Sequence, residues 1–330
     1  ASRFVMKLHD DETTKPFVSN LFQVFHEAPH GMSAWVIGNI TRVDNLVSGA
    51  DVGLTCSGPI MTKMRSVRKY GNSIIDQDIV LYKGIPRIDF HTRIDWEEVA
   101  SAEEDAPMLR VSFSPVLRNS VATFEIPFGS IVRPADGREV PALRWIDVSD
   151  HEYGVSLLND CKYGFSVSGN TMSMTLLRTS YSPDPMPDRG HHELLYSLYP
   201  HAGDWRNALT FRRGYEINHP LEAKSLPRHR IGIGSRTERA SFIKLSPDNV
   251  VLSGLKLAED SDDIILRIYD ATGEGARAEV AFGFEVNEAK EVDLMEKELS
   301  KASLQGGTLR VELRPNDIRS IRITKGPRPT

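Results

Sequence analysis

Residues 87–96 are the stretch that most constrains the fold, because their side chains alternate strictly between two faces. One face carries Ile88, Phe90, Thr92, Ile94 and Trp96, and the other carries Arg87, Asp89, His91, Arg93 and Asp95. A period of two residues is the pattern of a β-strand with one packed face. The break at residues 83–86, with Gly84 and Pro86, predicts a hairpin that joins this strand to one ending near Leu81.

The same short alternating runs, separated by Gly, Pro, Asn and Asp, recur along the chain and predict an all-β protein. Further strands are expected at these ranges: 108–113, 123–126, 154–158, 172–177, 194–199, 242–245, 250–257, 264–269, 278–284, 309–313 and 318–323. So many strands indicate a large antiparallel sandwich rather than a small barrel. Only a few segments are expected to be helical, chiefly residues 290–301.

A chain of 330 residues exceeds what one hydrophobic core normally serves, so two unequal domains are expected. Residues 218–239 are rich in Pro, Arg and Gly and have little apolar patterning, which is typical of a connecting arm. We therefore expect a large β-sandwich over residues 1–225 and a smaller one over residues 226–330.

Composition excludes several classes of function. No run approaches the eighteen or so apolar residues of a membrane helix, so no membrane partner is expected. The net charge of -5 comes without a basic run, which argues against nucleic acid. Cys56 and Cys161 have no metal-ligand spacing, and a reducing, cytoplasmic setting fits them best. The first eleven residues show no secretory signal.

The densest group of polar side chains lies between Tyr181 and Trp205, in a loop stiffened by Pro183, Pro185 and Pro187 and in the strand that follows it. We select Asp188, Arg189 and His192 as candidate substrate-binding residues, because carboxylate and guanidinium groups hydrogen-bond sugar hydroxyls. The competing interpretation is that these residues only stabilise the loop and the strand after it. His191 and His192 would point to opposite faces of a strand, which argues against a shared metal ion.

Several motifs occur in the same order as in the carboxy-terminal region of family 38 glycoside hydrolases, the α-mannosidases. They are Arg144-Trp145-Ile146-Asp147, Tyr153-Gly154, Asp188-x-Gly190-x-His192 and Pro200-His201-x-Gly203-Asp204-Trp205. The chain resembles that region over roughly residues 20–325. The resemblance implies a supersandwich of the galactose mutarotase-like type, followed by a smaller sandwich.

The resemblance also implies what the chain lacks. Family members begin with a barrel that supplies an Asp nucleophile, an acid–base Asp and the ligands of one zinc ion. Retaining hydrolysis needs two carboxylates roughly 5 Å apart, and we assign no catalytic residue and no metal ligand to this chain. It is expected to support the substrate cleft of a retaining α-mannosidase, with that barrel and a mannose-containing glycan as partners, and to be inactive alone.

Two residues have implied roles that are less direct. In some family members an Arg of this region reaches the carboxylates beside the metal, and Arg189 is the candidate for that role. Trp35 stands where many relatives carry an Asp-Ala-Trp-Asp motif, but only Ala34 and Trp35 are kept. A buried aromatic anchor is the expected role of Trp35, and of Trp96, Trp145 and Trp205.

Other interpretations stay open at this stage. The polar face of residues 87–95 is expected to be solvated or internally paired, with contact to the missing barrel as the alternative. The chain could act as a stand-alone carbohydrate-binding module, or less plausibly as an aldose epimerase. A homo-oligomer is also left open.

Overall fold

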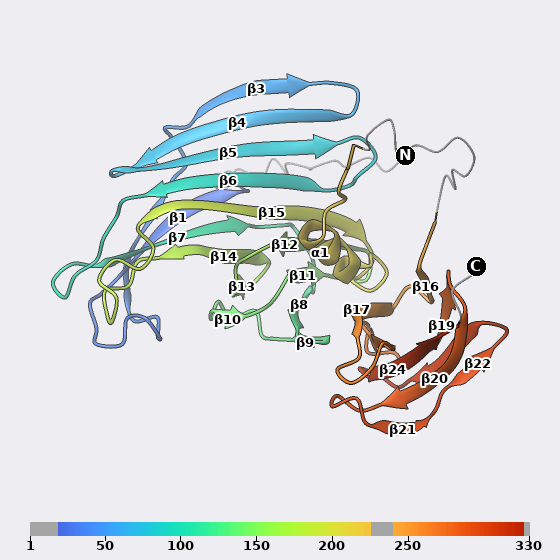
Figure 1. Cartoon of the computed structure of the whole chain (residues 1–330). Helices are drawn as coiled ribbons and strands as arrows, with labels where there is room; N and C mark the ends of the chain where they lie inside the picture. Colours follow the sequence, from blue (N-terminus) through green and yellow to red (C-terminus); the bar gives the residue numbers. More distant parts are fainter. Residues whose placement is uncertain (1–18, 226–239, 327–330) are drawn as a thin grey trace.

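The computed structural model describes residues 19–225 and 240–326. Within them the strands form four sheets, and every pairing is antiparallel. Figure 1 shows a large sandwich, whose long upper strands are blue to teal, and a small red sandwich beside it. The all-β class predicted from the alternation is therefore confirmed, as is the order of a large sandwich followed by a small one.

The large sandwich contains a six-stranded and a nine-stranded sheet. The six-stranded sheet has the order β10-β13-β14-β7-β1-β2, and the nine-stranded sheet has the order β3-β4-β5-β6-β15-β12-β11-β8-β9. The strands are β1 (Leu21–Glu27), β2 (Ile40–Asn45), β3 (Asp51–Ser57), β4 (Met61–Tyr70), β5 (Ser73–Tyr82), β6 (Ile88–Trp96), β7 (Ala106–Phe113), β8 (Val121–Ile126), β9 (Gly129–Val132), β10 (Val140–Pro141), β11 (Trp145–Ser149), β12 (Tyr153–Asn159), β13 (Gly164–Ser168), β14 (Thr171–Arg178) and β15 (Gly190–Ala202).

The core of the large sandwich lies between these two sheets, and the alternation of β6 explains how it is filled. Phe90, Ile94 and Trp96 are buried, while Asp95 is exposed. Phe90 stacks on Tyr196 of β15 with ring centroids 5.1 Å apart. Burying side chains of this size contributes about 1.5–3 kcal/mol each. The indole N–H of Trp96 donates to Thr179 Oγ1 at 2.7 Å, so its polar atom is satisfied as well.

The small sandwich packs a four-stranded sheet, β16-β19-β23-β22, against a five-stranded one, β17-β18-β24-β20-β21. Its strands are β16 (Ile243–Ser246), β17 (Val250–Leu257), β18 (Ile264–Asp270), β19 (Ala276–Phe282), β20 (Val286–Val292), β21 (Glu298–Lys301), β22 (Ser303–Gln305), β23 (Thr308–Leu313) and β24 (Ile318–Lys325).

The prediction of a helix at residues 290–301 is wrong. This segment forms the end of β20, a turn and β21. Its Glu, Lys, Leu and Met residues favour a helix in isolation, but Val292 is buried beside β24, and Glu296 has a positive φ that stops any helix. Tertiary packing has overridden local propensity.

One helix was not anticipated. Helix α1 (Thr210–Asn218) covers part of the outer face of the nine-stranded sheet (Figure 1). A Cβ on Gly214 would lie 3.2 Å from the Trp145 ring and 3.3 Å from Arg144 Cβ, so a larger residue would have to displace these side chains slightly.

The two sandwiches share a small apolar core of their own. Trp145, Trp205 and Phe211 of the large sandwich pack with Val251 and Tyr269 of the small one. The hydroxyls of Tyr215 and Tyr269 lie 3.2 Å apart. The predicted connecting arm at residues 218–239 lies mostly outside the described residues, and the domain boundary at 225/226, which falls where the description stops, stays a prediction.

Candidate functional site

Three loops gather at the end of the large sandwich that faces away from the small one (Figure 1). They are residues 28–39 between β1 and β2, residues 97–105 between β6 and β7, and residues 179–189 between β14 and β15. The pairing of β7 with both β1 and β14, and of β6 with β15, brings them to one end. We call these three segments the loop end.

The structure places Asp188 and Arg189 in this loop end and His192 beside it, at the start of β15. Asp188 Oδ2 accepts a hydrogen bond from the Arg178 N–H at 2.7 Å, and His192 Nε2 donates to the Asp188 carbonyl at 2.7 Å. Arg189 turns the other way and donates from Nε to Glu97 Oε2 at 2.7 Å. Asp188 and His192 thus brace the loop, and Arg189 stays in an exposed ion pair. Their binding of substrate remains a prediction.

Glu27 is the central anchor of the loop end, and sequence reasoning missed it. Its buried carboxylate accepts hydrogen bonds from Arg178 Nη2 at 2.8 and 2.9 Å, from Gly38 N–H at 2.6 Å and from His30 Nε2 at 2.5 Å. Charge-assisted bonds of this kind are about twice as strong as neutral ones. Residues 28–39 are therefore pinned to β14.

Ser33 supplies the second anchor. Its buried hydroxyl accepts hydrogen bonds from the N–H groups of Tyr181 at 3.3 Å and Ser182 at 3.2 Å. The Tyr181 hydroxyl in turn donates to the His30 carbonyl at 2.7 Å. Residues 28–39 and 179–189 consequently form one hydrogen-bonded unit.

The expectation of a buried Trp35 is wrong, because its side chain is exposed. The backbone of its loop turns at Met32, whose carbonyl accepts hydrogen bonds from the N–H groups of Trp35 and Val36. The buried position in this loop is taken by Ser33 instead. The expected burial of Trp96, Trp145 and Trp205 is confirmed.

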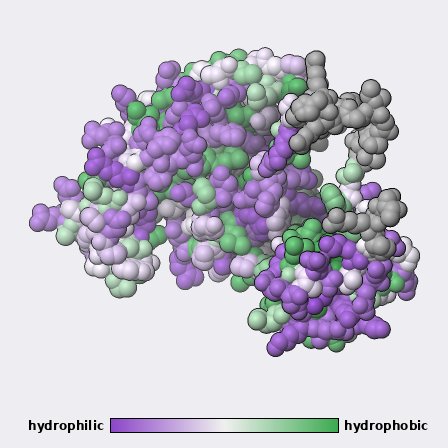
Figure 2. Space-filling view, viewed as in Figure 1, coloured by the Kyte–Doolittle hydropathy of each residue, from purple (hydrophilic) through white to green (hydrophobic). Residues whose placement is uncertain are grey.

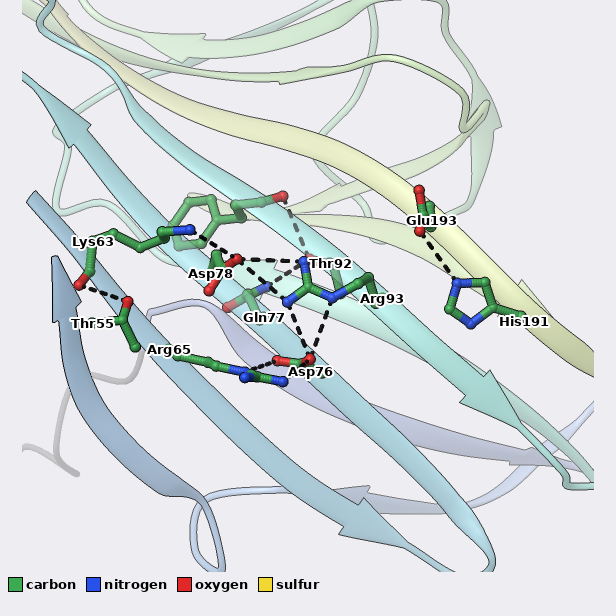
Figure 3. Close-up of polar contacts among 11 residues, drawn as sticks. Thr55, Lys63, Arg65, Asp76, Gln77, Asp78, Thr92, Arg93, His191 and Glu193 are labelled. Carbon is green, nitrogen blue, oxygen red and sulfur yellow. Dashed lines mark hydrogen bonds and ion pairs between the residues drawn. The ribbon is translucent and has the colours of Figure 1, made fainter. Parts of the chain in front are cut away.

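A row of charged side chains crosses the outer face of β4, β5 and β6, as Figure 3 shows. Arg65 binds Asp76 through two hydrogen bonds of 2.6 and 2.8 Å, and Arg93 Nη2 lies 3.1 Å from Asp76 and 3.3 Å from Asp78. Lys63 Nζ lies 3.5 Å from Asp78. We call these five residues the charged row, and they support the prediction that this face is internally paired.

The electrostatics of the charged row do not suit acid–base catalysis. The Arg65 guanidinium holds the pKa of Asp76 below its usual value, although burial acts in the opposite direction. A general acid needs the reverse shift. Farther along the same face, hydrogen bonds to Asp95 and then Glu193 raise the pKa of His191, which keeps this exposed imidazole protonated to higher pH (Figure 3).

A carboxyl group with a raised pKa lies elsewhere, in Glu125 of β8. Burial raises its pKa, and the ion pair with Arg144 opposes that effect. Arg144 Nη2 lies 2.5 Å from Glu125 Oε1, and its guanidinium stacks on the ring of Tyr215 at 3.7 Å. This buried pair ties the nine-stranded sheet to α1 and is closed to a substrate.

Asp147, Ser156 and His201 form a buried cluster that contains the residue types of a hydrolase triad. His201 Nε2 faces both Asp147 Oδ2, at 2.7 Å, and Ser156 Oγ, at 3.2 Å, while Nδ1 faces the Gly203 carbonyl at 3.1 Å. A catalytic triad instead uses the two ring nitrogens for serine and aspartate separately. Because the three side chains are buried as well, the cluster is structural.

The residues present do not fit a zinc ion. Within residues 19–225 and 240–326, no three His, Cys, Asp or Glu side chains come together as a metal site would require. His191 and His192 face opposite sides of β15, since they pair with exposed Asp95 and buried Ile94 respectively.

In the described part of the chain no helix is long and apolar enough to cross a membrane. Figure 2 shows mainly hydrophilic residues on the visible surface, with hydrophobic ones scattered among them.

The fold defines the structural class of the chain. It is an all-β protein of two antiparallel sandwiches that are joined through a shared apolar core. Residues 1–186 match the family described as "Glycosyl hydrolases family 38 C-terminal domain", and residues 249–321 match "Glycosyl hydrolases family 38 C-terminal beta sandwich domain". The chain belongs to the family 38 glycosyl hydrolase C-terminal domains, which confirms the resemblance seen in the sequence.

Relatives and solved structures agree with this assignment. The chain is 32% identical to human "Alpha-mannosidase 2C1" over 94% of its own length and 31% of that protein. It is 26% identical to the "Alpha-mannosidase" of Saccharomyces cerevisiae, over 92% of the chain and 31% of the relative. An α-mannosidase structure from Enterococcus faecalis V583 superposes with a TM-score of 0.74 at 14% identity, covering 93% of this chain and 38% of that one. The chain thus spans about a third of the length of these two relatives.

Proposed function

We propose that this chain is the C-terminal region of a retaining α-mannosidase, and that it supports the substrate cleft without supplying the catalytic pair. The observation that carries the proposal is the match of both sandwiches to family 38 C-terminal domains, with relatives that are named α-mannosidases and are three times as long. A mannose-containing glycan is the corresponding substrate.

The carboxylates of the described residues support the second half of the proposal. Retaining hydrolysis needs one nucleophilic and one protonated carboxyl group roughly 5 Å apart across the sugar. Asp76 and Asp78 are neutralised by the charged row, and Glu27 and Glu125 are buried in ion pairs. These four groups are committed to cations of the chain itself. The likeness to family 38 implies that the catalytic pair, and a zinc ion with its ligands, belong to an amino-terminal barrel.

A cytoplasmic location is part of the same proposal, since Cys56 and Cys161 are free thiols. An aldose epimerase is a weaker alternative, because it needs a His acid and a Glu base that face each other. His192 and Glu193 project to opposite faces of β15.

An assay with an aryl α-mannoside tests the proposal. The purified 330-residue chain should give no turnover, with or without added zinc. The same chain joined to the catalytic region encoded upstream of Ala1 should hydrolyse the substrate with retention at the anomeric carbon. Turnover by the chain alone, or an upstream sequence without a barrel, would contradict the proposal.

A further inference from the structure

The loop end exposes an apolar centre. Met32 is 56% exposed, Trp35 67% and Val36 50%, and Met186 of the neighbouring segment is also 50% exposed. Trp and Met are enriched at the centres of protein interfaces, where binding removes the water around them. These four apolar side chains lie on two adjoining segments and form an exposed patch whose contact with water is unfavourable.

This apolar centre is held in place by buried polar anchors. Glu27 binds Arg178, His30 and the Gly38 N–H, and Ser33 binds the backbone of Tyr181 and Ser182. The loop therefore loses little conformational entropy when a partner binds. A rigid loop that presents an indole outward has the properties of an interface anchor.

The rim of the loop end is acidic. Its segment of residues 97–105 carries five acidic residues, Glu97, Glu98, Glu103, Glu104 and Asp105. Arg189 donates a hydrogen bond to Glu97 and so joins this segment to residues 179–189. The Thr41 hydroxyl, in β2 just after residues 28–39, donates to Asp105. A complementary partner has an apolar pocket bordered by Lys and Arg.

We propose that the loop end is the surface that docks onto the catalytic region of the family 38 enzyme, with Trp35 as its anchor. The inference rests on the proposed function and adds the location of the contact. The small sandwich contacts the large one through Tyr269 and the shared apolar core, at the end opposite the loop end, so among the described residues it does not cover the loop end.

Two other occupants fit less well. A second copy of the chain would bring two acidic rims together, which opposes association. A sugar needs hydrogen-bonding groups beside the aromatic ring, but the carboxylate of Glu27 and the hydroxyls of Ser33 and Tyr181 are already engaged within the chain.

Hydrogen–deuterium exchange tests the docking. We would compare the 330-residue chain with the full-length enzyme that also contains the upstream catalytic region. Amides of residues 30–36 and 182–187 should exchange at least about tenfold more slowly in the full-length enzyme. Equal exchange in both proteins, with protection on the charged row or elsewhere, would overturn the inference.

A pair of variants sharpens the result. Trp35→Ser in the full-length enzyme should restore fast exchange in both segments, and 0.5 M salt should do so in part because the rim is charged. Tyr163→Ser is the matched control, since Tyr163 is 61% exposed but lies outside the loop end. An identical response of the two variants would contradict the role of Trp35.

The activity assay separates the two proposals. Full-length enzyme that hydrolyses α-mannosides while its loop end exchanges freely would refute the docking surface and leave the proposed function intact. Protection of the loop end in an enzyme without mannosidase activity would support the docking surface and refute the proposed function. A dimer of the 330-residue chain that Trp35→Ser dissociates, or slowed exchange on adding mannobiose to that chain, would assign the surface to another occupant and overturn the inference.

Discussion

Arg178 binds the carboxylate of Glu27 through a bidentate contact that joins two strands 151 positions apart in the chain. The carboxylate is 1% exposed, so the ion pair lies in the low-dielectric interior. Because both strands end at the loop end, this one contact fixes where two of its three segments begin.

Arg178→Met should destabilise the protein by about 3–5 kcal/mol, because it leaves the buried Glu27 carboxylate without its cation. The double variant Glu27→Gln with Arg178→Met should lose less than the sum of the single variants. Urea unfolding measures both values. Arg138→Met is the control, since Arg138 forms an exposed ion pair with Asp136 and should leave stability unchanged. Additive losses would show that the pair is not coupled.

Gly154→Ala should destabilise the large sandwich by about 1–3 kcal/mol. A Cβ at this position would lie 2.3 Å from His201 Cε1 and 2.5 Å from the Ser149 Cβ, so the buried cluster of Asp147, Ser156 and His201 must shift. Gly53→Ala is the matched control within a strand, because a Cβ there would meet no atom within 4 Å. Equal melting temperatures for the two variants would contradict this account of Gly154.

Tyr269→Ala should uncouple the two sandwiches. The ring is buried in the shared core and packs edge-on against Phe128 at 5.4 Å. Its removal should cost about 3–5 kcal/mol, and calorimetry should then resolve two transitions instead of one. Leu257→Ala, at an exposed position of β17, should preserve the single transition. One transition in both variants would indicate coupling that does not depend on Tyr269.

Asp270→Asn should remove a source of acid lability. Burial acts to raise the pKa of Asp270, but the N–H groups of Gly275, Thr272 and Asn316 outweigh it and hold the pKa below 3.8. A lowered folded-state pKa stabilises the protein above the unfolded value, and this contribution is lost as the pH falls through the folded value.

The free energy of unfolding should therefore fall more steeply in wild type than in Asp270→Asn as the pH drops below about 4. Urea titrations at a series of pH values measure the difference. Asp262→Asn, at an exposed position, should follow the wild-type curve. A constant gap between wild type and Asp270→Asn at every pH would refute the assigned cause.

The strands were predictable because an alternating sequence has only one regular way to bury its apolar face. Ile88, Phe90 and Trp96 show this for β6, and the hairpin at Gly84 follows from its turn residues. The ordered motifs along the chain, among them those around Asp188 and His201, likewise identified the family. These features are local, so they can be recognised in the sequence without the tertiary structure.

Two of the errors concern contacts between distant segments. Trp35 was expected to be buried, yet its loop is held by Glu27 and Ser33 through partners about 150 positions away, so the indole is left outside. Residues 290–301 have helical composition, but residues 290–292 pair with β24, and residues 298–301 fold back onto β20. No pattern within either segment records these partners.

The sequence by itself determined the class of fold, the order of the two sandwiches and the family, because alternation, turn residues and ordered motifs are properties of short segments. Only the tertiary structure decided which polar side chains are used internally and which remain free. Asp188 and His192 brace a loop, the charged row neutralises its own carboxylates, and Trp35 faces outward. The physical reason is that burial and ion pairing depend on the segments that meet in space, and most of those are far apart in the chain.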